Sequence, residues 1–117
     1  MNLNEMGQKL VLENLTPEVA VDDARPVLYG YATDLLSDVL AHALHGGVLV
    51  TVQVHLNVVA VAAHAELAAV VFSSGRRPEE AVRKKAIEEG IVLYATEQPA
   101  FDVVGRLYEL GLRGTHA

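Results

Sequence analysis

The stretch VLVTVQVHLNVVAVAAHAELAAVVFSSGRRPEE, residues 48–80, decides the fold. It opens with the β-branched run Val48–Val54, continues through the apolar segment Asn57–Ala65 and ends in a second apolar run, Ala68–Ser73. Apolar character that is nearly continuous over a short run is typical of a strand covered on both faces. Strand, helix and strand in succession predict a parallel unit with a crossover helix.

On both sides of this unit, the sequence continues to alternate between strand-like and helix-like segments. Similar runs predict strands at Leu10–Asn14, Pro26–Tyr31 and Ile91–Ala95. Apolar periodicity, Pro at helix starts and Gly at helix ends predict four more helices, which are Leu3–Lys9, Asp34–His45, one from Pro78 to the stop at Gly90 and one from Pro99 to the stop at Gly111. We therefore expect a single α/β domain over residues 1–117, with three α/β/α layers. Its sheet should be mostly parallel or mixed and have four or five strands.

Composition narrows the range of partners. The chain has 117 residues, 51% of them hydrophobic, no cysteine and a formal net charge of -6. Nucleic-acid binding needs clustered Lys and Arg, so no nucleic-acid partner is expected, and without cysteine there is no disulfide or thiolate chemistry. The longest apolar stretch is interrupted by polar side chains, so no membrane span is expected. The N-terminus lacks the pattern of a secretory signal, which favours a cytoplasmic protein.

Small polar residues follow the predicted strands directly. In a parallel sheet all of these positions lie along the carboxyl edge, where open α/β folds hold their ligands. The candidate ligand-binding residues are therefore Thr33, Asp34, His55, Asn57, Ser73, Ser74, Gly75, Arg76, Arg77 and Thr96.

The loop Ser73–Arg77 carries the one pair of adjacent arginines in the chain. Backbone N–H groups, two hydroxyls and two guanidinium groups could hold a phosphate or a carboxylate there. The alternative is a solvated loop whose arginines balance Glu79 and Glu80. His55 has two interpretations as well, ligand contact or proton transfer on the one hand and a turn histidine bonded to backbone on the other. The chain has neither a P-loop motif nor a GxSxG nucleophile elbow.

Two further pairs have the spacing of metal ligands. Asp34 and Asp38 lie four residues apart at a helix start, which fits a metal or general-base pair but favours capping and the positive end of the helix dipole. His42 and His45 lie three apart at a helix end, where imidazole is stabilised without any metal. We expect no metal, no cofactor and no catalytic residue.

Three runs of the chain, Gly30–Ala43, Thr51–Glu80 and Gly90–Leu112, resemble the DRTGG domain family in order and spacing. The name-giving Asp-Arg-Thr-Gly-Gly run is reduced here to Arg25 and Gly30. Members of that family occur alone and as accessory domains, for example in pyrophosphatases that carry CBS domains. Their fold is similar to the N-terminal domain of HPr kinase/phosphorylase, which lacks that enzyme's P-loop. The resemblance implies a regulatory or ligand-sensing module that dimerises.

Residues and resemblance together predict a non-catalytic regulatory module. It would bind a small phosphorylated metabolite or nucleotide-like ligand at the carboxyl edge and act through dimerisation or a protein partner. The alternative is a small phosphotransferase or hydrolase that uses His55 and the Ser73–Arg77 loop. The homodimer is expected because Asn57–Ala65, with Asn57 as its N-cap, is apolar around nearly its whole circumference, and because Tyr108 and Leu112 on the last helix should be exposed.

Overall fold

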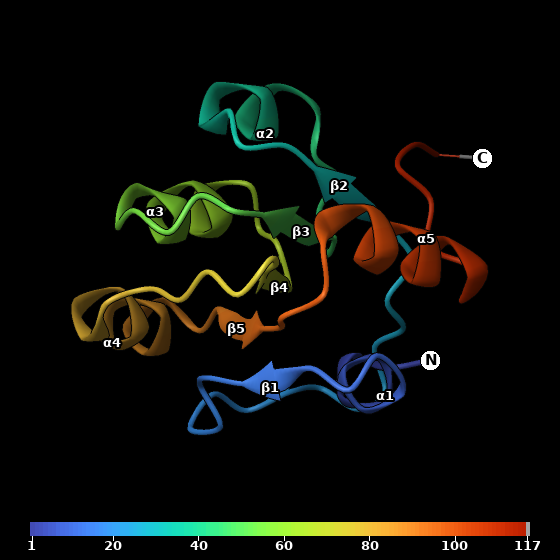
Figure 1. The fold of residues 1–117 in the computed structure, drawn as a ribbon, viewed down its shortest axis with the longest axis horizontal. Helices are drawn as coiled ribbons and strands as arrows, with labels where there is room; N and C mark the ends of the chain where they lie inside the picture. The colour runs from blue at the N-terminus through green and yellow to red at the C-terminus, as the bar shows by residue number, and fades with distance from the viewer. Residues whose placement is uncertain (117) are drawn as a thin grey trace.

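The computed structural model describes residues 1–116, and within them a five-stranded sheet is covered by helices on both faces (Figure 1). The elements in chain order are α1 (Leu3–Lys9), β1 (Glu13–Asn14), β2 (Gly30–Ala32), α2 (Leu36–His42), β3 (Val48–Thr51), α3 (Asn57–His64), β4 (Ala69–Phe72), α4 (Glu80–Glu89), β5 (Val92–Ala95) and α5 (Ala100–Glu109).

The sheet has the strand order β1-β5-β4-β3-β2. Strands β2 to β5 are all parallel, with Leu49 of β3 opposite Tyr31 of β2 and Val70 of β4. Strand β1 pairs antiparallel with β5. The predicted α/β class and the mostly parallel sheet are confirmed. Because the four parallel strands run the same way, their carboxyl ends meet along one edge.

Helices α2, α3 and α4 cover one face of the sheet, and α1 and α5 cover the other (Figure 1). Side chains along each strand alternate between these two layers, as the pleat of a strand requires. On β3, Leu49 packs toward α2–α4, whereas Val48 and Val50 pack toward α1 and α5. A sheet buried on both faces explains why the strand segments are almost wholly apolar.

The predicted strands are longer than the observed ones. The prediction Val48–Val54 is wrong at its end, because the ladder stops at Thr51 and the β-branched residues beyond it lie in the loop. The prediction Leu10–Asn14 shrinks to β1, since Leu10 caps α1 and Val11 has a positive φ of 56°. The prediction Pro26–Tyr31 moves to Gly30–Ala32.

Several helices start later or end earlier than predicted, because turns form at their ends. Helix α2 is shorter than Asp34–His45 at both ends, and α4 begins two residues after Pro78. Asn57 is the first residue of α3 and not its cap, because Leu56 holds the cap position without a side-chain hydrogen bond. Gly90 ends α4 in the left-handed conformation, with φ of 72°, as predicted.

The apolar circumference of α3 is covered largely by this chain itself. Helix α3 packs between α2 and α4 as well as on the sheet (Figure 1), so Val58, Val59 and Ala62 are fully buried. Less apolar surface of Asn57–Ala65 is therefore left for a second copy than expected, and the dimer through this helix stays a prediction. Leu112, expected to be exposed, is buried too, whereas Tyr108 is exposed as expected. In residues 1–116, none of the helices has the length and apolar character to cross a membrane.

Candidate functional site

The carboxyl edge of the sheet gathers the loops that follow β2, β3, β4 and β5. The loops after β2, β4 and β5 begin by extending the ladder, since the N–H groups of Thr33, Ser73 and Thr96 donate to Val50 O, Thr51 O and Phe72 O at 3.3, 3.1 and 3.0 Å. The predicted arrangement of these residues along one edge is confirmed by the parallel pairing.

The loop after β4 is held tightly by the loop after β5. Ser74 N donates to Gln98 O at 2.8 Å and Gly75 N to Thr96 O at 3.0 Å, while Arg76 N closes a turn on Ser73 O. The left-handed Gly75, with φ of 73°, lies against the carboxylate of Glu97, and a Cβ there would fall 2.6 Å from Glu97 Oε2. The N–H groups of Ser73, Ser74, Gly75 and Arg76 thus already have acceptors and are not free to hold a phosphate.

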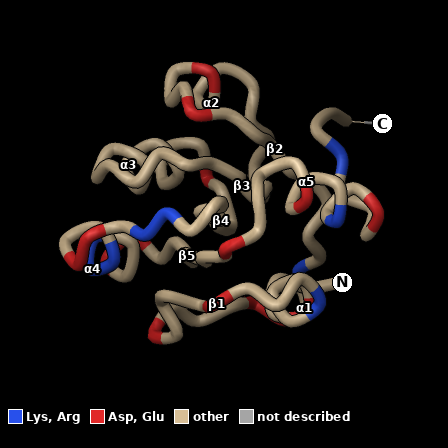
Figure 2. Tube along the Cα trace, in the orientation of Figure 1, with Lys and Arg blue, Asp and Glu red and all other residues tan. Residues whose placement is uncertain are grey.

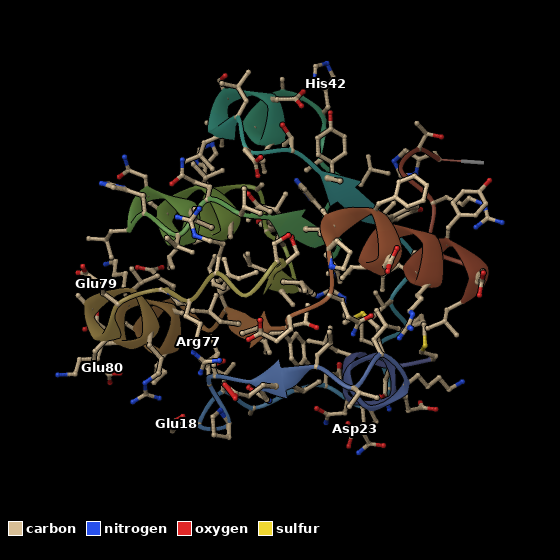
Figure 3. The ribbon with its side chains drawn as sticks, viewed as in Figure 1. Glu18, Asp23, His42, Arg77, Glu79 and Glu80 are labelled. Carbon is tan, nitrogen blue, oxygen red and sulfur yellow. The ribbon has the colours of Figure 1, made fainter. Side chains whose placement is uncertain are left out.

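The two arginines of this loop differ in their partners. Arg77 extends toward β1 and donates to the carboxylate of Glu13 (Figure 3). That hydrogen bond raises the pKa of the Arg77 guanidinium. Arg76 is exposed and makes no ion pair with any residue in the described part of the chain. Figure 2 shows this basic segment between β4 and α4.

His55 and Arg77 line the same depression, which we name the His55 hollow. It encloses about 510 Å³ between the loops after β3 and β4, and its walls include Gln53, Val54, His55, Leu56, Arg77 and Glu79. His55 Nδ1 accepts the Asn57 N–H at 3.1 Å. This contact assigns the ring hydrogen to Nε2, because a neutral imidazole has one donor and one acceptor nitrogen. His55 thus keeps a free donor while it turns the chain into α3.

Arg77 also borders a second depression, the Thr96 hollow, of about 340 Å³. Its polar walls are Glu13, Arg77, Thr96, Glu97 and Gln98. Two carboxylates face one guanidinium here, so this hollow is less favourable for an anion than the His55 hollow. The Oε1 atom of Gln98 is buried without a hydrogen-bond partner.

Ser73 is the one candidate that the fold encloses completely. It has no exposed surface, and its hydroxyl oxygen has no hydrogen-bond partner. A nucleophile must reach its substrate, and this hydroxyl is covered on all sides. Ser74, the next residue, is exposed.

Asp34 and Thr33 hold the edge together and line neither hollow. One oxygen of the Asp34 carboxylate accepts from Thr51 Oγ1 at 2.7 Å and from Val52 N at 2.9 Å. Thr33 Oγ1 accepts from Leu35 N at 3.1 Å. The Asp34 contacts tie the loops after β2 and β3 to each other, and the Thr33 contact shapes the loop after β2 itself.

The predicted site residues therefore separate into groups. The structure brings Arg77 together with His55 in one hollow and with Gly75 and Thr96 in the other. The candidates that line neither hollow are Thr33, Asp34, Asn57, Ser73, Ser74 and Arg76.

Asp38 does not pair with Asp34. Its Oδ1 accepts from the Tyr31 hydroxyl at 2.9 Å and lies 2.8 Å from His42 Nδ1. His45 instead lies 3.2 Å from Glu66. Within residues 1–116, no three side chains among His, Cys, Asp and Glu converge as metal ligands.

Asp38 should make the free energy of unfolding depend on pH in acidic solution. The Tyr31 hydrogen bond first, and then that of His42, hold the pKa of Asp38 below its ordinary value of 3.8. A depressed pKa stabilises the folded state above the unfolded value, and this stabilisation is lost as the pH falls through the folded value. Urea midpoints measured between about pH 6 and pH 3 should fall more steeply for the wild type than for Asp38→Asn. Equal slopes would contradict this.

Sequence reasoning missed three residues of the site. Gln53 falls inside the predicted strand Val48–Val54, Glu97 directly follows the candidate Thr96 without being a candidate itself, and Glu13 lies 64 positions from its partner Arg77. The position of Gln53 just before His55 was a local signal. Nothing local connects Glu13 to Arg77, since their contact depends on β1 pairing with β5.

Comparisons with known proteins give a likeness in fold. No family model and no curated protein matches the sequence. Among solved structures, the chain is similar to the CBS and DRTGG domains of the regulatory region of Clostridium perfringens pyrophosphatase, a structure complexed with the activator diadenosine tetraphosphate. The TM-score is 0.69 at 15% sequence identity, over 95% of this chain and 47% of the other, so this chain spans about half of that structure. At this identity the likeness establishes the fold, a mixed α/β domain of the kind found in that regulatory region.

Proposed function

We propose that this chain is a non-catalytic regulatory domain of the DRTGG type, which senses a small phosphorylated ligand such as a nucleotide in the His55 hollow. One observation carries the proposal, namely that Gln53, His55 and Arg77, from two successive loops at the carboxyl edge, line a single depression. The likeness to a regulatory region that binds a dinucleotide supports it.

The walls of the His55 hollow suit both parts of a nucleotide. The Arg77 guanidinium is a fixed charge suited to phosphate, and the His55 Nε2–H and the Gln53 amide are further donors. Val54, Leu56 and Val82 supply an apolar wall for a base. A bound phosphate would compete with Glu13 for Arg77, so binding would loosen the contact between this loop and β1. Ligand binding would thereby change how the loop after β4 is held against β1.

The buried hydroxyl of Ser73 argues against the alternative of a phosphotransferase or hydrolase built on His55 and the Ser73–Arg77 loop. In the described residues no hydrogen bond joins His55 to Ser73 or Ser74. We therefore infer that the site binds and does not turn over its ligand. The binding signal would pass on through a second copy of the chain or a protein partner in the cytoplasm.

A thermal-shift series with inorganic phosphate, AMP, ATP and diadenosine tetraphosphate tests this function. A ligand at a hundred times its dissociation constant adds about 2.7 kcal/mol of stability, which is a readily measured shift. Titration calorimetry should then show binding weakened about tenfold by Arg77→Ala, since a charge-assisted contact is lost. Glu13→Gln should strengthen binding roughly threefold, because it removes a competing carboxylate whose exposed pair with Arg77 is weak.

Lys84→Ala is the matched control. Lys84 is exposed on α4 and lines neither hollow, so this variant loses one positive charge away from the site and should bind as the wild type does. Circular dichroism confirms that each variant is folded. If Lys84→Ala and Arg77→Ala weaken ligand binding equally, the effect comes from net charge and not from a contact with Arg77, which would contradict the proposed site. Release of phosphate that is lost in His55→Ala would favour the enzymatic alternative.

A further inference from the structure

A further depression lies at the opposite edge of the sheet, where β3, β4 and β5 begin. It encloses about 240 Å³, and we name it the amino-edge pocket. Gly46, Ala68 and Gly90, which lie just before these three strands, form one wall. The facing wall comes from residues 20–27 of the segment that joins β1 to β2. The length of the strands therefore separates this pocket from both hollows of the carboxyl edge.

The amino-edge pocket is lined mainly by aliphatic side chains. They belong to Leu3, Val21, Pro26, Val27, Leu67 and Val92. Among the described residues that line the pocket, none is aromatic. Its volume lies just below the range of pockets that hold drug-sized molecules. These walls and this size suit a small ligand with an aliphatic part.

Arg25 lies at the rim of the amino-edge pocket with an unpaired charge. Its guanidinium rests on the bare backbone of Gly46, since a Cβ built on that glycine would fall 2.9 Å from Arg25 Nη2. None of the ion pairs within residues 1–116 involves Arg25. A guanidinium is always charged and presents several donors in a fixed plane, which favours a carboxylate as its partner.

Asp22 supplies the opposite charge at the same rim. The two residues are the ends of one turn, because Arg25 N donates to Asp22 O at 3.1 Å, and the ends of such a turn lie within about 7 Å of each other. One oxygen of the Asp22 carboxylate accepts from Ala24 N at 2.9 Å, which leaves the other oxygen for a ligand. No ion pair joins Asp22 to Arg25 in the described part of the chain.

Two other carboxylates near the amino-edge pocket already have partners. Asp23 lies beside α1 (Figure 3), where Asn4 Nδ2 donates to its Oδ1 at 3.2 Å. Glu66, whose carbonyl oxygen accepts from Gly46 N, has its carboxylate 3.2 Å from His45 Nδ1. The pocket therefore offers one cation and one anion, side by side at the rim of an aliphatic wall.

We propose that the amino-edge pocket binds a free aliphatic α-amino acid such as L-leucine. The ligand's carboxylate accepts from the Arg25 guanidinium, its ammonium group donates to Asp22, and its side chain lies against the aliphatic wall. A simple carboxylate would be repelled by Asp22, and a simple amine would be repelled by Arg25. A ligand that carries both charges on one carbon satisfies both residues at once.

This site is independent of the ligand proposed for the carboxyl edge. None of the residues that line the amino-edge pocket lines the His55 hollow. Arg77→Ala should therefore leave L-leucine binding unchanged, and Arg25→Ala should leave nucleotide binding unchanged. Failure of one proposal is thus distinguishable from failure of the other.

Titration calorimetry with a series of small molecules tests the ligand class. L-leucine should bind to the wild type at millimolar concentration. The molecule 4-methylpentanoate lacks the ammonium group, 3-methylbutylamine lacks the carboxylate and glycine lacks the side chain, so each should bind at least about tenfold more weakly. A wild type that does not bind L-leucine overturns the proposal, and so does equal binding of 4-methylpentanoate or 3-methylbutylamine.

Two variants test the assigned contacts. Arg25→Ala and Asp22→Asn should each weaken L-leucine binding about tenfold or more, because each removes a charged partner. Asparagine keeps a side-chain oxygen for Ala24 N, so the turn is retained. Arg106→Ala and Asp102→Asn are the matched controls, since they make the same changes of charge at exposed positions of α5 that do not line the pocket.

The control variants should bind L-leucine as the wild type does, and circular dichroism confirms that each variant is folded. Unchanged binding in Arg25→Ala or in Asp22→Asn would overturn the proposal. Equal weakening in a variant and its control would overturn it too, because the effect would then come from net charge.

Discussion

Phe72→Ala should destabilise the fold by about 3–5 kcal/mol, the cost of truncating a buried phenylalanine in a close-packed core. Phe72 ends β4 at the centre of the sheet, is fully buried and packs in the core beneath α3 and α4. Removing its ring leaves a cavity between two rigid layers, which can collapse only in part. Urea unfolding, followed by circular dichroism, measures the change in the free energy of unfolding.

The chain supplies its own control, because its only other phenylalanine is Phe101. That ring is 90% exposed, so Phe101→Ala should change the stability of the monomer by no more than about 0.5 kcal/mol. The comparison is made at low concentration, where self-association does not contribute. If the two variants lost similar amounts of stability, Phe72 would not be in the core and Phe101 on the surface, which would contradict the structure.

Thr16→Val should destabilise the fold by about 2 kcal/mol, within the range for a buried donor left without a partner. Thr16 is fully buried, and its Oγ1 accepts the Leu93 N–H at 3.0 Å. This side chain continues the pairing of β5 after β1 ends, where Leu15 N donates to Leu93 O. Valine has nearly the same shape but offers no acceptor.

Thr16→Ser is the companion variant. Serine keeps the hydroxyl acceptor for Leu93 N–H and loses only a methyl group, so it should retain most of the stability that valine loses. Amide hydrogen exchange at Leu93 reports the same bond directly, and it should be faster in Thr16→Val. Protection of Leu93 that is unchanged in Thr16→Val would contradict the assigned role.

The sequence was informative about the order of elements because buried parallel strands are apolar on both faces. Runs such as Val48–Thr51 cannot be mistaken for surface segments. Strand ends were less well defined, since Val52 and Val54 have the same strand propensity as the ladder residues and only the partner strand decides where pairing stops. At β1, the apolar Leu10 belongs to the end of α1, which periodicity over so few residues cannot distinguish.

Which helix faces are buried could not be predicted from each helix alone, because it depends on the helices packed beside it. The apolar surface of α3 suggested a partner chain, but α2 and α4 cover it. Helix α5 carries a comparable surplus, and within the described residues no helix covers Phe101. Of the candidate site, the shared edge followed from parallel topology, whereas the bonds that occupy Arg77 and the Ser74 N–H come from β1 and from the loop after β5. Contacts between segments so far apart in the sequence cannot be predicted from the residues around either segment.

The unequal edges of the sheet bear on how far association can proceed. Filament growth needs an acceptor edge on each side of every subunit, so that each added copy offers a new end. Here β1 has only two residues, and its Glu13 is bound to Arg77, which leaves little backbone for an incoming strand. At the other edge, the first part of β2 is already paired, because Gly30 N donates to Arg113 O. We therefore expect that neither edge adds a strand from another copy and that the protein forms no filaments, even in concentrated solution.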